Sequence, residues 1–388
     1  EADEHLDARV FPAFLSDRHS VRYQFASGYA WSRFTLAKWE WIDKQGFAQW
    51  TKPDAAEFLS LFPFTLPTWQ RADVVLGEDQ ELYWRIADAN MYEADEGSHD
   101  AIDKLLQYDR PRTAISCLYQ LHQQHKKIDH AQVAKALLAA VHSSEPQHQL
   151  EEHSSIKLIA LLQETKSTDQ SELARIEWVY LPLLEHHLGV SPKTIESEMA
   201  ENSNTFCDMI RLVFGPEEEE KPIEEASPSQ QNIATNAYRL LSNWKVVPGS
   251  RDGRFSGAAL IEWSQAMREN ATRTGHLGIS LDMFGRVLTH APEDPSGLWI
   301  HKVVAAILDA PDAETLRDGF RIQLYNSRGA HWVDPTGAPE RGFAEKYRTR
   351  AEAVENAGFM RFASTLRDLA AEYDHEAERV IGRSKRDE

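Results

Sequence analysis

Cysteine is scarce in this chain: its 388 residues include only Cys117 and Cys207. Two cysteines cannot form the framework of several bridges that holds small secreted domains together. Both lie on apolar helical faces, so we expect two buried thiols in a reducing compartment. No apolar run approaches the roughly 20 residues that a membrane-spanning helix needs, and no basic-then-apolar signal segment opens the chain. The sequence therefore predicts a protein without disulfides that does not span a membrane.

The common catalytic and nucleotide-binding motifs are also missing. The chain has no G-x-x-x-x-G-K-[ST] phosphate loop, no G-x-G-x-x-G after a strand, no C-x-x-C, no H-E-x-x-H and no G-x-S-x-G. His122 and His125 share a helix, but no carboxylate or third ligand accompanies them, and the adjacent His186 and His187 point apart. We therefore predict no catalytic residue, no metal site and no cofactor, although an active site of an unfamiliar kind is left open.

Positive charge is in deficit, because 61 acidic residues face 42 basic ones and the net charge is −19. Such a chain repels a phosphate backbone on average, which disfavours general nucleic-acid binding. Aromatic residues are plentiful, with 11 Trp and 16 Phe. Burial at helix crossings explains them most simply, and an exposed aromatic binding face is the alternative.

Helical periodicity dominates the sequence, and strand signals are almost absent. Helices are predicted over 21–42, 78–93 and 171–187, the last with a kink at Pro182. From about 98 to 214, helices of 12 to 18 residues alternate with short turns, as in stacked helical pairs. The prediction is an all-α fold: an α-solenoid-like helical stack over 1–215, followed by a second helical lobe over 230–388.

An acidic segment containing prolines, 216–229, separates these two parts. Its like charges and low apolar content predict a solvated linker. Further helices follow, with Ser280 and Asp312 predicted as N-caps, and Ser191 is predicted to cap a helix in the first part. Two antiparallel helices around Gly358 close the chain, and the one plausible extended piece is 330–333.

The most informative polar cluster lies between 290 and 328. Asp294 precedes a proline and fits a turn or cap, and side chains in such loops often satisfy helix ends. The alternative is a site for an anionic or nucleotide group, in which arginine forks bind phosphate or carboxylate and Tyr325 and Trp332 stack on a base. The candidate ligand-binding residues are His290, His301, Arg321, Tyr325, Asn326 and Arg328.

Two runs of the chain, ELARIEWVYLPLL at 172–184 and GFRIQLYNSRG at 319–329, carry a resemblance to a family. They resemble the C-terminal helical region of large bacterial multidomain proteins that carry an NTPase or nuclease module and are found among defence genes. The resemblance implies a cytoplasmic recognition or scaffold region, and it transfers no catalytic residue. A first residue other than Met is consistent with a fragment of such a protein.

These observations predict a non-catalytic recognition or scaffold module that binds a protein partner. A concave face on a helical stack offers a large contact surface without chemistry. By the resemblance, the module would be the sensor part of a bacterial defence system. The alternative is an enzyme or an anionic-ligand-binding domain with its site near His290 to Arg328.

Overall fold

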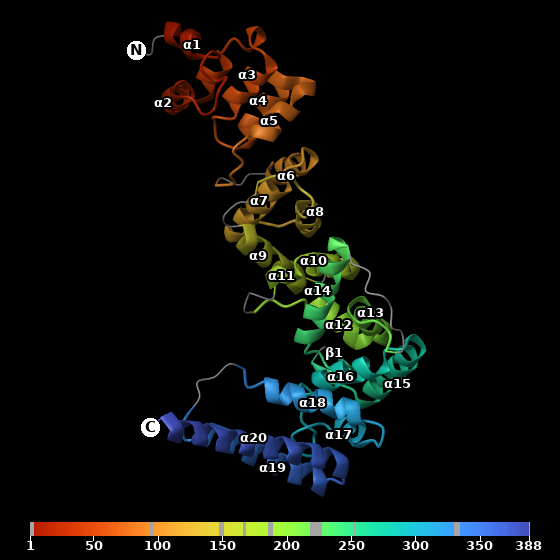
Figure 1. The fold of residues 1–388 in the computed structure, drawn as a ribbon. Helices are drawn as coiled ribbons and strands as arrows, with labels where there is room; N and C mark the ends of the chain where they lie inside the picture. Colours follow the sequence, from red (N-terminus) through yellow and green to blue (C-terminus); the bar gives the residue numbers. More distant parts are fainter. Residues whose placement is uncertain are drawn as a thin grey trace. The chain divides into compact units, whose positions relative to one another are not determined.

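The computed structural model describes residues 4–92, 97–146, 151–165, 168–184, 189–217, 227–251, 253–329 and 334–387. These residues form twenty α-helices, two short 3-10 helices and one two-stranded hairpin (Figure 1). The predicted all-α fold and the packing of helices in pairs are confirmed, whereas the solenoid-like arrangement stays a prediction. The chain divides into two compact units, Glu1–Ser191 and Pro192–Glu388.

The first unit has one continuous hydrophobic core. Its helices are α1 (Glu4–Val10), α2 (Val21–Asp43), α3 (Lys52–Leu59), α4 (Leu66–Leu76), α5 (Glu81–Ile86), α6 (Ser98–Gln107), α7 (Pro111–Gln123), α8 (His130–Ala140), α9 (Glu151–Glu164), α10 (Gln170–Val179) and α11 (Leu181–Leu184), with 3-10 turns η1 (Phe47–Gln49) and η2 (Gly77–Asp79). Aromatic rings surround the buried Phe58, which meets Phe11 and Trp50 edge to face at 4.9 and 5.1 Å between centroids. These rings form part of the core, as predicted, whereas Phe25 and Trp31 of α2 are exposed.

The long helix predicted over 21–42 is α2, and Ser20 caps it by accepting from the backbone N–H of Tyr23. The helix is broken near its end, where Lys38 has φ 50° and ψ −143°. A second break lies just before Pro182, where a kink is predicted: α10 ends at Val179 and α11 begins at Leu181. Proline lacks the N–H donor and crowds the preceding turn, so the helix breaks at Tyr180 and Pro182 lies in the first turn of α11.

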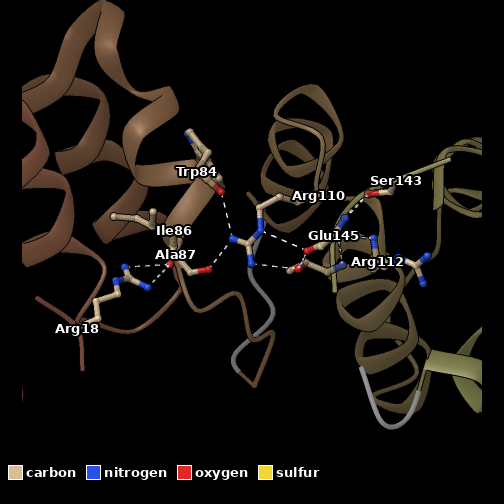
Figure 2. Close-up of polar contacts among 9 residues, drawn as sticks. Arg18, Trp84, Ile86, Ala87, Arg110, Arg112, Ser143 and Glu145 are labelled. Carbon is tan, nitrogen blue, oxygen red and sulfur yellow. Dashed lines mark hydrogen bonds and ion pairs between the residues drawn. The ribbon is translucent and has the colours of Figure 1, made fainter. Parts of the chain in front are cut away.

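The prediction of one helix over 78–93 is wrong, because α5 ends at Ile86. Two arginines bind the carbonyl groups at its end (Figure 2). Arg110 Nη1 donates to the carbonyls of Trp84 and Ala87 at 3.1 and 2.6 Å, and Arg18 donates to that of Ile86 at 3.3 Å. The two guanidinium groups thus donate to carbonyl groups that the N–H groups of a further helical turn would otherwise bind.

Figure 2 also shows how Arg110 links this end to α7. Glu145 accepts from the backbone N–H groups of Arg112 and Thr113 at 2.8 and 3.2 Å, so it caps the first turn of α7. The same carboxylate lies 3.4 Å from Nε of Arg110. Arg110 thus binds the end of α5, and Glu145 caps the start of α7.

The second unit begins earlier than the sequence suggests. It contains α12 (Lys193–Glu201), α13 (Ser203–Val213), α14 (Pro228–Asn243), β1 (Ser250–Arg251), β2 (Arg254–Phe255), α15 (Gly257–Thr274), α16 (Leu277–Leu288), α17 (Lys302–Asp309), α18 (Glu314–Asn326), α19 (Ala338–Asn356) and α20 (Met360–Asp387). The ring of Phe206 on α13 packs at 5.4 Å from both Trp244 and Trp263. This aromatic contact attaches α13 to the second unit, whereas we expect the break at 216–229.

Both ends of the expected linker are structured. Glu217 donates its backbone N–H to Gly275 O at 2.8 Å and accepts from the N–H of Ile279 at 3.2 Å. Ser227 forms a capping box with Gln230 at the start of α14. Residues 218–226, which carry most of the predicted linker, lie outside the described residues, and so does the expected extended piece at 330–333.

Three predicted N-caps are wrong. Ser280 is buried within α16, which begins at Leu277. Asp312 pairs with Arg268 at 3.0 Å, while α18 begins after Ala313. The cap predicted at Ser191 is displaced to Pro192. By contrast, the closing helix pair is confirmed: Gly358, with φ +95°, makes the turn between α19 and α20, which lie side by side (Figure 1).

Candidate binding site and surface

The candidate residues near the start of the polar cluster serve helix ends. His301 is the N-cap of α17, and its Nδ1 accepts from the backbone N–H of Val303 at 3.2 Å. Asp294 accepts from the N–H groups of Ser296 and Lys302 at 2.9 and 3.0 Å. Hydrogen bonds from Ser296 and Lys302 hold the pKa of Asp294 well below its usual range. The predicted turn or cap role of Asp294 is therefore confirmed, while His290 follows the end of α16 and makes no helix cap.

The candidate residues near the end of the cluster lie on α18 and just beyond it. Arg321 pairs with Glu372 on α20 and lies 3.8 Å from Asp318. Tyr325 donates its hydroxyl to Glu376 at 3.1 Å, and Asn326 is exposed at the last position of the helix.

Arg328 is the most deeply placed of these residues. Its side chain is 8% exposed and pairs with Glu340, whose side chain is 1% exposed. A second carboxylate, that of Glu376, lies 3.4 Å away, and the ring of Phe343 lies 5.3 Å below the guanidinium. No described contact links this group to His290 or His301. The two arginines thus hold α19 and α20 against α18, and the anionic-ligand site stays a prediction.

Neither cysteine has the environment of a reactive thiol. Burial raises the pKa of Cys117 to about 12 and that of Cys207 to about 11. A reactive thiol needs a lowered pKa and access to solvent, and both thiols are free and buried. Within the part of the chain that the structure describes, no three His, Cys, Asp or Glu side chains gather to hold a metal ion. No described helix has the length and apolar character to cross a membrane.

A pocket of about 500 Å³ lies in the first unit, and we call it the Asp7 pocket. It is bounded by α1 with the turn that follows, the end of α2, and η1. Its lining consists of Asp7, Ala8, Phe11, Pro12, Arg33, Trp41, Lys44, Gln45, Gly46, Gln49 and Trp50. Both its volume and its mixture of aromatic and polar groups are those of small-molecule sites.

Asp7 is the polar centre of this pocket. Its carboxylate accepts from the Tyr29 hydroxyl at 2.6 Å, Trp41 Nε1 at 2.8 Å and Arg33 Nη2 at 3.0 Å. Burial alone would raise the pKa of Asp7, but hydrogen bonds from Trp41, Tyr29 and Arg33 outweigh burial and lower it. Asp7 is therefore ionised at neutral pH.

We expect Asp7→Asn to lower the free energy of unfolding at pH 7 by about 2 kcal/mol, because Arg33 loses its buried partner. The pKa of Asp7 is lower in the folded than in the unfolded chain, so its charge stabilises the fold above about pH 3.9. That contribution is lost as the pH falls through the folded-state pKa. Urea unfolding of both proteins from pH 7 to pH 3 measures it, and an equal gap at every pH would contradict the role of the charge.

Apolar side chains are exposed along α2, on the side away from the core. Val21, Phe25 and Leu36 are 80%, 52% and 77% exposed. At 3.6 residues per turn these three, together with Gly28 and Ser32, fall within about 80° around the helix. The buried Ala26 and Ala30 occupy the opposite side. We call the stripe of Val21, Phe25, Gly28, Ser32 and Leu36 the α2 outer face.

Sequence reasoning missed the pocket and assigned the aromatic residues of α2 mainly to the core. The segment before Arg18 has little periodicity, so nothing local marks Asp7 as the partner of α2. The outer face could have been found, because Val21, Phe25 and Leu36 share a phase that Ala26 and Ala30 oppose.

Comparison with models of known protein families, with curated proteins and with solved structures yields no match. The resemblance to defence-type multidomain proteins therefore stays a prediction.

Proposed function

We propose that this chain is a non-catalytic recognition module that binds an acidic amphipathic helix of a protein partner through the α2 outer face. The observation that carries the proposal is the exposure of Val21, Phe25 and Leu36 along one line of a helix. Large apolar side chains in a row on a water-facing helix cost free energy unless a partner covers them, and such patches mark interaction sites.

The centre of the stripe suits close approach by a helix. Gly28 and Ser32 are small, and a Cβ added at Gly28 would meet no atom within 4 Å. Large residues at both ends and small ones between them form a shallow groove along the helix. A partner helix can place its apolar side chains in such a groove at spacings of three and four residues.

Charge favours an acidic partner. Between Val21 and Lys38 the helix carries Arg22, Arg33 and Lys38 and no acidic residue. Arg22 and Lys38 are exposed, so they can pair with carboxylates at the rim of an interface. This part of the helix is therefore basic in a chain whose net charge is negative. Rim charges of this kind steer association and select the partner more than they add affinity.

The proposal is tested by placing a photo-crosslinking residue at Leu36 and identifying the captured protein, whose binding is then measured with both components purified. We expect Phe25→Ser with Leu36→Ser to weaken binding by about 100-fold, since each buried apolar contact contributes more than about 1 kcal/mol. The melting temperature should stay unchanged, because both side chains face water.

Val74→Ser is the matched control, since Val74 is 85% exposed on α4, outside the stripe. It should leave the affinity within about twofold. An equal loss of affinity from Val74→Ser and from the double variant would reject the α2 outer face as the binding surface.

A further inference from the structure

The Asp7 pocket has hydrogen-bond donors and hydrogen-bond acceptors that are not fully used. A carboxylate offers about four acceptor sites, and Asp7 uses three of them. Arg33 has five N–H donors and gives one to Asp7; among the described residues it has no other hydrogen-bond acceptor. Gln45 donates its amide N–H to Trp41 O at 3.2 Å, which leaves its amide oxygen as an acceptor. A ligand group that both donates and accepts fits this wall, and the hydroxyl group is the simplest one.

Charged side chains of both signs line the pocket, namely Asp7, Arg33 and Lys44, and each has a partner of opposite charge. Asp7 and Arg33 pair at 3.0 Å, and Lys44 pairs with Glu40 at 3.0 Å. An anionic ligand would be desolvated beside Asp7, and a cationic one beside Arg33, so each would meet one unfavourable charge. A neutral ligand avoids both penalties.

Aromatic surface completes the pocket. Trp50 is half-buried: its ring packs on Phe47 and Phe58 at 5.2 and 5.1 Å, and part of it stays accessible. Phe11 and Trp41 lie behind it and are almost fully buried. The accessible part of the Trp50 ring can cover an apolar ring face, while the polar wall binds the groups at the ring edge.

We propose that the Asp7 pocket binds a neutral, hydroxyl-rich ring compound of the size of a mono- or disaccharide. Arg33 and Gln49 donate to its hydroxyl oxygens, Asp7 and Gln45 accept from its hydroxyl protons, and Trp50 covers its apolar face. The pocket volume of about 500 Å³ accommodates one or two such rings. This inference is independent of the α2 outer face, so one can fail while the other holds.

The test is ligand-detected NMR with the full chain and a panel of neutral sugars at millimolar concentration: glucose, galactose, N-acetylglucosamine, maltose and cellobiose. Glucose 6-phosphate, glucosamine and adenosine complete the panel as an anion, a cation and a neutral ring with a base. At least one neutral sugar should bind, with a change in tryptophan fluorescence, and the two charged sugars should bind at least 10-fold more weakly. A glycan array then separates a free sugar from the terminal unit of a larger glycan.

Two variants locate the binding. Trp50→Leu should weaken it at least 10-fold, and Gln49→Ala, at an exposed position, should weaken it about threefold without changing the melting temperature. Gln24→Ala, exposed on α2 and outside the pocket, should change nothing. The proposal is overturned if no neutral sugar binds, if a charged sugar or adenosine binds best, or if Gln49→Ala binds as well as Gln24→Ala.

Discussion

Replacing Gly319 with alanine should lower the free energy of unfolding of the second unit by about 3 kcal/mol or more. A Cβ at Gly319 would lie 2.0 Å from the backbone oxygen of Asp282 on α16. The contact is reciprocal, because a Cβ at Gly285 would lie 2.0 Å from the oxygen of Leu316 on α18. Backbone atoms cannot move aside as a flexible side chain can, so α16 and α18 would have to separate. The midpoint of urea unfolding measures the loss.

Gly342→Ala provides the matched control for this prediction. Gly342 lies inside α19, and an added Cβ would meet no atom within 4 Å. Alanine favours a helix more than glycine does, so this change should raise the free energy of unfolding by about 0.5 to 1 kcal/mol. If the two glycine-to-alanine changes shift the free energy of unfolding in opposite directions, the loss at Gly319 comes from the close helix crossing and not from helix propensity. Equal shifts would show that α16 and α18 do not cross closely.

Helix positions were predictable where local periodicity decides them. In α16, Leu281, Phe284 and Val287 recur at a spacing of three residues, and all three are buried. Gly285 on this helix and Gly319 on α18 were not recognisable as a crossing point. Gly285 and Gly319 are 34 positions apart, and the sequence does not show that two helix backbones meet there. A glycine within a helical pattern predicts only a locally less stable helix, and its packing role becomes clear once the partner helix is known.

Helix ends were less predictable, because side chains from distant positions decide several of them. Arg18 binds the carbonyl of Ile86 across 68 positions, and Arg110 reaches Ala87 across 23. Such bonds end α5 without a glycine or a proline at its end. The same limit applies to Ser280, which has the residue type of a cap but lies in a helix that begins three positions earlier.

The candidate site shows this limit for function as well. The sequence groups these polar residues by their nearness along the chain, but the partners of the arginines lie on helices that only the fold brings together. Glu372 is 51 positions from Arg321, and Glu340 is buried although glutamate is normally a surface residue. An arginine with a carboxylate partner cannot be told from a free one by local spacing.

Arg328→Ala should lower the free energy of unfolding by about 3 to 5 kcal/mol, because it leaves the Glu340 carboxylate buried without this partner. Arg321→Ala should cost less than about 1 kcal/mol, since the side chains of Arg321 and Glu372 are 29% and 42% exposed and water screens their pair. Thermal unfolding of the two single variants gives the comparison. The order of the two losses follows from burial alone.

The same variants distinguish a structural role from an anionic-ligand site. If the arginines hold α19 and α20 in place, Arg328→Ala melts at a lower temperature, and neither phosphate nor ATP binds the parent chain. Arg328→Ala with Glu340→Gln should then recover part of the lost stability, because the buried charge is removed together with its partner. If the arginines form a ligand site, the double variant Arg321→Ala, Arg328→Ala keeps the parent melting temperature and loses phosphate binding. Calorimetric titration of both anions into the parent chain, alongside the melting curves, decides between these outcomes.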